Sequence, residues 1–194
     1  MSSFVFLHCF CNPNFAFFAA LRENFPMSTF LEEILKLKRR RVEEAKRQFK
    51  IQNLEFKIGA DRPPHRLREA LQNQNRINII AEIKRASPSK GIINDKIDVA
   101  ELAENYERGG ACAIGACAIS VLTEEDRFQG SLEDLKIVRR NLSLPVLRKD
   151  FIFDEFQIHE AASAGADVIL LIAAMLDDAA LSRLRRLAED ELKM

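Results

Sequence analysis

Two charged residues, Glu82 and Lys84, close the apolar run that begins at Ile79. Successive side chains of a strand point to opposite faces, so residues two apart share a face, and this spacing pairs a carboxylate with an ammonium group. Burying both charges is expensive unless they pair with each other or meet a polar ligand. The pattern therefore indicates a satisfied ion pair or a binding site, and a solvated strand end is the alternative.

Charged residues also close a second apolar run. The segment from Leu144 to Phe151 contains Arg148, Lys149 and Asp150 near its end, and a third run, from Asp167 to Ala173, is almost wholly apolar. Continuous runs of Val, Ile and Leu are typical of strands in a sheet that is covered on both faces. We therefore expect buried parallel strands whose carboxyl ends carry polar groups.

Helical segments alternate with these strands. Each has an apolar stripe at helical spacing, and most begin at a residue whose side chain can accept hydrogen bonds from the first amides. Glycine after the first and third of them predicts where those helices end. The four expected helices are Asp98–Arg108, Ser131–Arg140, Asp154–Ala164 and Asp177–Leu192.

Regular alternation of strand and helix predicts an α/β fold with a parallel sheet and right-handed crossovers. Polar residues at the carboxyl ends of the strands favour either the mouth of a barrel or the crevice of a doubly wound sheet. No G-x-G-x-x-G motif follows a strand, which weakens the dinucleotide-binding interpretation. A (β/α)8 barrel fits the pattern better.

Five ordered motifs between residue 27 and the end resemble the indole-3-glycerol phosphate synthase family, a TIM-barrel family of tryptophan biosynthesis. They are EIKRASPS from Glu82, AISVLTE from Ala118, FQGS from Phe128, LPVLRKDF from Leu144 and GADVILLI from Gly165. The resemblance implies an enzyme, a carboxy-lyase that cyclises 1-(2-carboxyphenylamino)-1-deoxyribulose 5-phosphate with loss of CO2 and water. It implies no metal and no cofactor.

The resemblance also implies roles for individual residues. Lys149 matches the general acid that protonates the ribulose carbonyl oxygen while the aromatic carbon attacks. Lys84 matches a second lysine that contacts substrate and takes part in proton transfer during dehydration. Glu82 matches a carboxylate that positions substrate hydroxyls and the lysines.

Four further positions match the family's substrate-binding residues. Phe128, Phe151 and Leu170 match the apolar walls around the aromatic ring, and Ser87 matches a position near the phosphate. Apolar residues of this kind are more often plain core residues. Only their place within the motifs favours a binding role.

The chain reaches Met194 after four strand–helix units, and the resemblance therefore predicts a barrel truncated at about that point. In the family, a glutamate base lies on the fifth strand, an asparagine on the sixth, and much of the phosphate site after strands seven and eight. These have no counterpart in the sequence, so we expect activity to be lost or strongly reduced. The alternatives are a non-catalytic half-barrel, with possible self-association through exposed strand edges, or another phosphate-binding barrel such as phosphoribosylanthranilate isomerase.

Residues 1–26 fall outside the resemblance. They hold half of the chain's 14 phenylalanines but no helical or strand period, so a disordered extension from a start assigned upstream of Met27 is expected, followed by a partial barrel domain over 27–194. Thr29 and Glu32 have capping-box spacing and open a helix that resembles the family's extra N-terminal helix over the barrel mouth. Its basic run, residues 38–41, is interpreted as a solvated face.

A direct repeat interrupts the family pattern, since residues 111–115, ACAIG, are followed by ACAIS at 116–120. An odd insertion would exchange the faces of a strand, so the second copy is expected to form the strand and the first to be extruded into the loop.

Charge and composition limit the classes of partner. The 29 basic and 29 acidic residues cancel, which argues against nucleic-acid or membrane partners. No apolar run is long enough for a membrane span. His8, Cys9 and Cys11 lack a second ligand pair, so no metal site is predicted. The sequence as a whole indicates a cytoplasmic enzyme with a phosphorylated small-molecule substrate.

Overall fold

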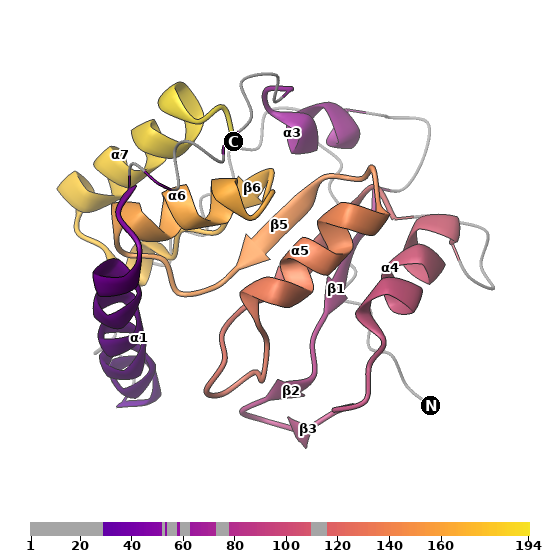
Figure 1. Ribbon diagram of the computed structural model, residues 1–194, viewed down its shortest axis with the longest axis horizontal. Coiled ribbons are helices and arrows are strands. Elements are labelled where there is room, and N and C mark those ends of the chain that lie inside the picture. Colours follow the sequence, from indigo (N-terminus) through magenta and orange to yellow (C-terminus); the bar gives the residue numbers. More distant parts are fainter. Residues whose placement is uncertain (1–28, 52, 54–57, 59–62, 73–77, 110–115) are drawn as a thin grey trace.

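The computed structural model describes residues 29–51, 53, 58, 63–72, 78–109 and 116–194, and its centre is a parallel sheet of four strands (Figure 1). The spatial order of the strands is β1 (Ile80–Ile83), β4 (Ala118–Leu122), β5 (Val146–Lys149) and β6 (Val168–Ile169). The helices that follow them are α4 (Val99–Arg108), α5 (Leu132–Asn141), α6 (Glu155–Ser163) and α7 (Asp178–Arg186). The alternation predicted from the sequence is therefore confirmed.

Each of these helices begins directly after a residue whose side chain accepts a hydrogen bond from a backbone amide of the first turn. The four capping residues are Asp98, Ser131, Asp154 and Asp177. Such caps satisfy amides that have no partner within the helix. Gly109 and Gly165 follow α4 and α6 with φ of 83° and 94°, a left-handed conformation that glycine adopts at little cost.

The two faces of the sheet differ in character. One face carries Ile83, Ile119 and Val121, which are all buried, and α4 and α5 lie across the sheet in Figure 1. On the opposite face the central strand is buried at Ser120 and Leu122, whereas flanking positions on the neighbouring strands are half-buried. The expectation of a sheet covered on both faces is thus met on one face and only at the centre of the other.

Two strands are shorter than the sequence suggests. β5 begins at Val146 rather than Leu144, because Pro145 has no amide to donate, although its carbonyl oxygen accepts from Ile119. β6 covers only Val168–Ile169 of the expected Asp167–Ala173. As an outer strand of the described sheet, β6 pairs on one side alone, with β5, and this limits how far the ladder extends.

Several short elements were not anticipated. The loop after β1 forms an antiparallel hairpin of β2 (Ala86–Ser87) and β3 (Gly91–Ile92). A 3-10 turn occupies Ala173–Met175. The last expected helix ends as α7 at Arg186 and continues as a π-helical segment, Leu187–Glu191. Two-residue strands and single turns leave too little periodicity for a sequence pattern to reveal.

At the amino end of the sheet lies the short helix α3 (Arg66–Leu71). Arg66 donates to the carboxylate of Asp167 at 2.8 Å, and Arg139 of α5 reaches the same oxygen at 3.2 Å. The backbone amide of Val146 also donates to that oxygen, at 2.9 Å. Asp167 therefore joins the start of β5 to two helices at the end of the sheet opposite the charged strand ends.

A long helix, α1 (Thr29–Gln48), lies on the carboxyl side of the strands (Figure 1). The expectation that residues 38–41 form a solvated face is wrong for Lys38, which is 3% exposed. Lys38 Nζ lies 2.8 Å from Asp150 and 3.3 Å from Glu125, and Arg41 Nη2 lies 2.7 Å from Asp126. Lys38 and Arg41 of the run thus dock α1 onto acidic loops that follow β4 and β5.

Some expectations lie outside the described residues: the extension over 1–26, the side chain of Thr29 in the capping box, and the first copy of the repeat. The second copy does lead into β4, as predicted, and its last three residues are the first three of that strand. Among the described helices, none combines the length and apolarity that crossing a membrane would require.

Candidate active site

The carboxylate of Glu82 bridges two lysines from different strand ends. Its Oε1 accepts a hydrogen bond from Lys84 Nζ at 2.7 Å, and its Oε2 accepts one from Lys149 Nζ at 2.6 Å. The Glu82 side chain is 8% exposed, whereas those of Lys84 and Lys149 are 21% and 39% exposed. The three residues named from the sequence as the catalytic set therefore lie together, with the two ammonium groups partly open to solvent.

The strand register explains why these groups meet. Glu82 pairs with Ser120 across the ladder, and Ser120 pairs with Leu147, so the side chains of all three point to one face. Lys149 follows Leu147 by two residues and shares that face. Because β4 lies between β1 and β5, Glu82 and Lys149 reach toward each other over the central strand, and this requires long side chains at both positions.

The protonation of Glu82 follows from its partners. Burial alone would raise the pKa of the Glu82 carboxyl, but the hydrogen bonds and charges of Lys149 and Lys84 outweigh burial and lower the pKa below its ordinary value. Glu82 is thus an anion at neutral pH. Burial of the phenol, together with the charge of Glu82, raises the pKa of Tyr106, which keeps Tyr106 neutral.

The apolar positions named from the sequence differ in how closely they meet. The rings of Phe128 and Phe151 lie with centroids 6.3 Å apart and planes tilted by 43°, which is within the range of separations that aromatic pairs prefer. The carbonyl oxygen of Phe128 accepts from the amide of Ala86 at 3.2 Å, which ties the loop after β4 to the β2–β3 hairpin. Ser87 lies on that hairpin, and Leu170 is half-buried just beyond β6.

A buried ionic cluster beside Lys149 was missed at the sequence level. Asp150 Oδ2 accepts from Thr123 Oγ1 at 2.7 Å and from Arg148 Nη2 at 3.0 Å, and Lys38 Nζ lies 2.8 Å away. A signal was present in α1, because Lys38 occupies the four-residue repeat of buried positions that contains Ile34 and Val42. A lysine on the buried stripe of a helix indicates a carboxylate partner.

Asp150 is expected to make stability fall in acid. Burial would raise the pKa of its carboxyl, but Lys38, Arg148 and Thr123 outweigh burial and lower it from 3.8 to about 2. The ionised Asp150 carboxylate therefore stabilises the folded chain by about 2 kcal/mol of unfolding free energy. This stabilisation is fully present above about pH 4 and is lost as the pH falls through about 2. Urea unfolding of the chain and of Asp150→Asn across this range measures it; equal pH slopes in the two proteins would contradict the assignment.

Among the described residues, one group of carboxylates is close enough to hold a metal ion. The side-chain oxygens of Glu124, Glu125 and Asp126 lie within 4.8 Å of one another. Glu124 accepts hydrogen bonds from three backbone amides, those of residues 126, 127 and 128. The other two pair with Lys38 and Arg41 of α1. The cluster is thus accounted for as a docking surface for α1.

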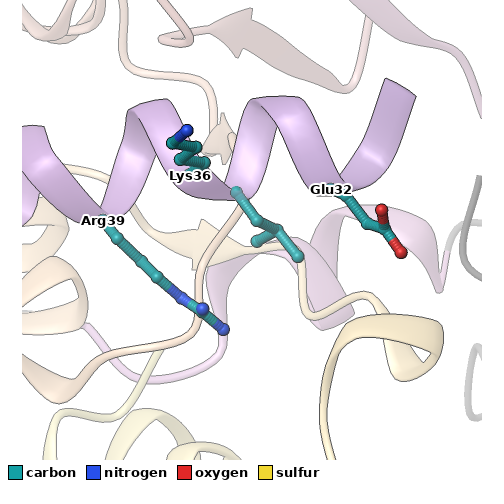
Figure 2. A pocket seen from close by; sticks show the side chains of 4 residues that line it. Glu32, Lys36 and Arg39 are labelled. Atoms are coloured by element: carbon teal, nitrogen blue, oxygen red, sulfur yellow. The ribbon is translucent and has the colours of Figure 1, made fainter. Parts of the chain in front are cut away.

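A cavity of about 370 Å³ adjoins α1 and is lined by Glu32, Leu35, Lys36 and Arg39 (Figure 2). In this view Glu32 and Arg39 point to the same side of the helix, whereas Lys36 points to the other. The guanidinium of Arg39 also lies 6.0 Å from the centroid of the Phe153 ring. The lining includes neither Glu82 nor the two lysines, so we do not assign the cavity to their chemistry.

Comparison with known proteins decides which barrel family this is. A sequence model of indole-3-glycerol phosphate synthase matches residues 31–194. The chain belongs to the indole-3-glycerol phosphate synthase family. This family has the TIM-barrel fold and consists of carboxy-lyases of tryptophan biosynthesis. The four-stranded parallel sheet is thus a partial TIM barrel, as the motifs suggested, and the isomerase alternative is set aside.

Relatives named as this synthase show the extent of the match. The chain is 44% identical over 167 residues to that of Carboxydothermus hydrogenoformans, covering 82% of this chain and 61% of the relative. It is 46% identical over 164 residues to that of Desulfotalea psychrophila, covering 84% and 61%. With that of Rhodococcus jostii, identity reaches 60% over 108 residues, covering 56% and 38%. The chain spans about 60% of the length of the first two.

Proposed function

We propose that this chain carries the proton-donating part of an indole-3-glycerol phosphate synthase site. The substrate would be 1-(2-carboxyphenylamino)-1-deoxyribulose 5-phosphate, and the products indole-3-glycerol phosphate, CO2 and water. The observation that supports this most is the pair of hydrogen bonds, 2.7 and 2.6 Å long, between one buried carboxylate and two lysines at the carboxyl ends of β1 and β5. Family membership supports the choice of substrate.

In this proposal Lys149 donates a proton to the ribulose carbonyl oxygen as the aromatic carbon attacks it. The new carbon–carbon bond closes the ring, and loss of CO2 restores the electron pair to the ring system. Lys84 then assists departure of the hydroxyl as water. Glu82, as an anion, orients both ammonium groups and the substrate hydroxyls. A cationic acid suits the first step because negative charge develops on the carbonyl oxygen.

The remaining roles rest on position. The tilted rings of Phe128 and Phe151 would hold the aromatic ring of the substrate, together with Leu170 beyond β6. Ser87 would approach the phosphate from the β2–β3 hairpin. We place the enzyme in the cytoplasm because its family serves amino-acid biosynthesis, and we expect no nucleic-acid partner because its charges balance. The proposed reaction uses neither a metal nor a cofactor.

The proposal is tested by assaying two proteins for indole-3-glycerol phosphate formation, followed by its fluorescence. One is the 194-residue chain, and the other is this chain joined to the carboxyl-terminal part of a curated relative that it does not match. We expect weak or undetectable turnover by the first and clear turnover by the second, because one positioned acid or base contributes about 10²–10⁴-fold. A folded, joined protein without activity would contradict the proposal.

The 194-residue chain is also expected to self-associate. In the described sheet β1 and β6 each pair with one neighbour only, and an outer strand with free amide and carbonyl groups pairs readily with a second copy. Light scattering after size-exclusion chromatography, over a range of concentrations, should show dimers or larger species. Val168→Lys on β6 should reduce them. A chain that remains monomeric at all concentrations would exclude this mode of association.

A further inference from the structure

The turn that follows Lys149 is held by side chains rather than by the sheet. Asp150 is 2% exposed, and its Oδ1 accepts from the amide of Phe151 at 2.9 Å. Gln157 of α6 donates to the carbonyl oxygen of Phe151, also at 2.9 Å. The amide and the carbonyl group of Phe151 are therefore both fixed. The backbone that follows Lys149 is thereby set by two buried polar side chains.

Asp150 is fixed in turn from three directions. Thr123 at the end of β4 and Arg148 on β5 hold its Oδ2 from within the sheet. Lys38 approaches the same oxygen from α1, and its side chain is 4% exposed. The lysine lies more than a hundred residues away in the sequence. The geometry of the turn after Lys149 thus depends on the docking of a separate helix.

Stability alone is a weak reason for this arrangement. Moving a lysine and an aspartate out of water is costly, and apolar side chains of similar volume at such sites are often equally or more stabilising. What an ion pair supplies and an apolar pair lacks is direction, since the ammonium must lie at one place relative to the carboxylate. The side chain of Lys149 is 39% exposed, which makes it the least covered of the three residues in the Glu82 cluster.

We propose that Lys38 is a positioning residue: by holding Asp150 from α1, it fixes the turn after β5 so that the ammonium of Lys149 stays on Glu82. The significance for catalysis rests on the function proposed above. The geometric claim does not rest on that function, because it concerns only how four side chains of this chain are held.

The test is carbon-13 NMR of the Glu82 carboxyl at neutral pH, with the chain labelled at the δ-carbon of glutamate and the resonance assigned by its loss in Glu82→Gln. Lys149→Ala supplies the reference shift for a Glu82 without this partner. Lys38→Met is compared with Lys46→Met, a matched control, because Lys46 also lies on α1 and pairs at 2.6 Å with Asp154 in the loop before α6. Lys38→Arg keeps the charge.

In Lys38→Met, we expect the Glu82 resonance to move more than half of the way to its position in Lys149→Ala. In Lys46→Met the resonance should stay near its chemical shift in the unsubstituted chain. In Lys38→Arg it should lie closer to that shift than it does in Lys38→Met. A folded Lys38→Met chain with an unmoved Glu82 resonance would overturn the proposal. If circular dichroism shows that Lys38→Met does not fold, the same measurement on Lys38→Gln decides the question.

The joined protein described above separates the two proposals. There, Lys38→Met should lower kcat while changing KM less, because substrate is bound by other residues. If the unsubstituted joined protein has no activity, the proposed function fails, yet the NMR result still decides whether Lys38 positions Lys149. A loss of thermal stability without a move of the Glu82 resonance would assign Lys38 a structural role only and overturn the positioning claim.

Discussion

Replacing Lys149 by alanine is expected to slow ring closure by about 10²–10⁴-fold in the joined, active protein, the range that one positioned general acid contributes. The loss should appear in kcat, because the proton is delivered in the transition state, while substrate affinity changes less. In the unsubstituted chain Lys149 Nζ lies 2.6 Å from Glu82. In the function proposed above, its removal would leave the developing oxyanion without the proton donor that β5 provides.

Single-turnover kinetics with saturating enzyme measure the effect. Lys136→Ala is the matched control, because Lys136 lies on α5, where it pairs with Glu133, and 44% of its side chain is exposed. Ring closure should be faster in Lys84→Ala than in Lys149→Ala. The later dehydration should instead be slowed in Lys84→Ala. Turnover of Lys149→Ala near the unsubstituted rate would remove Lys149 from the role of acid.

Replacing Asp150 by alanine should lower the free energy of unfolding by about 3–5 kcal/mol, the usual effect of leaving buried charges without their partner. The residue is fully buried, and the change would leave Lys38 with Glu125 and Arg148 with Glu160 as their remaining charged partners, although each cation is only 3% exposed. It would also remove the acceptors of Thr123 Oγ1 and of the Phe151 amide. Burial alone would lower the pKa of the Arg148 guanidinium, but the charges of Asp150 and Glu160 outweigh burial and raise the pKa above its ordinary value.

Urea unfolding followed by circular dichroism gives this value. The control is Asp126→Ala, because Asp126 also pairs with α1, through Arg41. This pair is more open to solvent, since 39% of the Arg41 side chain is exposed. Solvent-exposed pairs contribute about 0–1 kcal/mol, so the two variants should differ clearly. Equal effects would mean that the burial of Asp150 has no energetic consequence.

The local order of elements is a property of the sequence itself. The caps Asp98 and Ser131 begin helices, and the runs before Lys84 and Asp150 form strands, because both depend on residues close together in the chain. The alternation of these elements predicted a parallel sheet, since parallel strands need crossovers. The grouping of Glu82 with Lys84 likewise follows from two-residue spacing in a strand.

Tertiary structure decided the rest. Whether Glu82 meets Lys149 depends on the register of three strands, and a one-residue slip would turn one of them to the other face. The solvated interpretation of Lys38 was wrong because its partner, Asp150, lies on another element, and a sequence does not state which distant carboxylate a buried lysine will meet. The strand lengths of β5 and β6 followed from Pro145 and from pairing on one side. Spacing along the chain thus determined which side chains share a face, and packing between elements determined which charges lie within hydrogen-bonding distance.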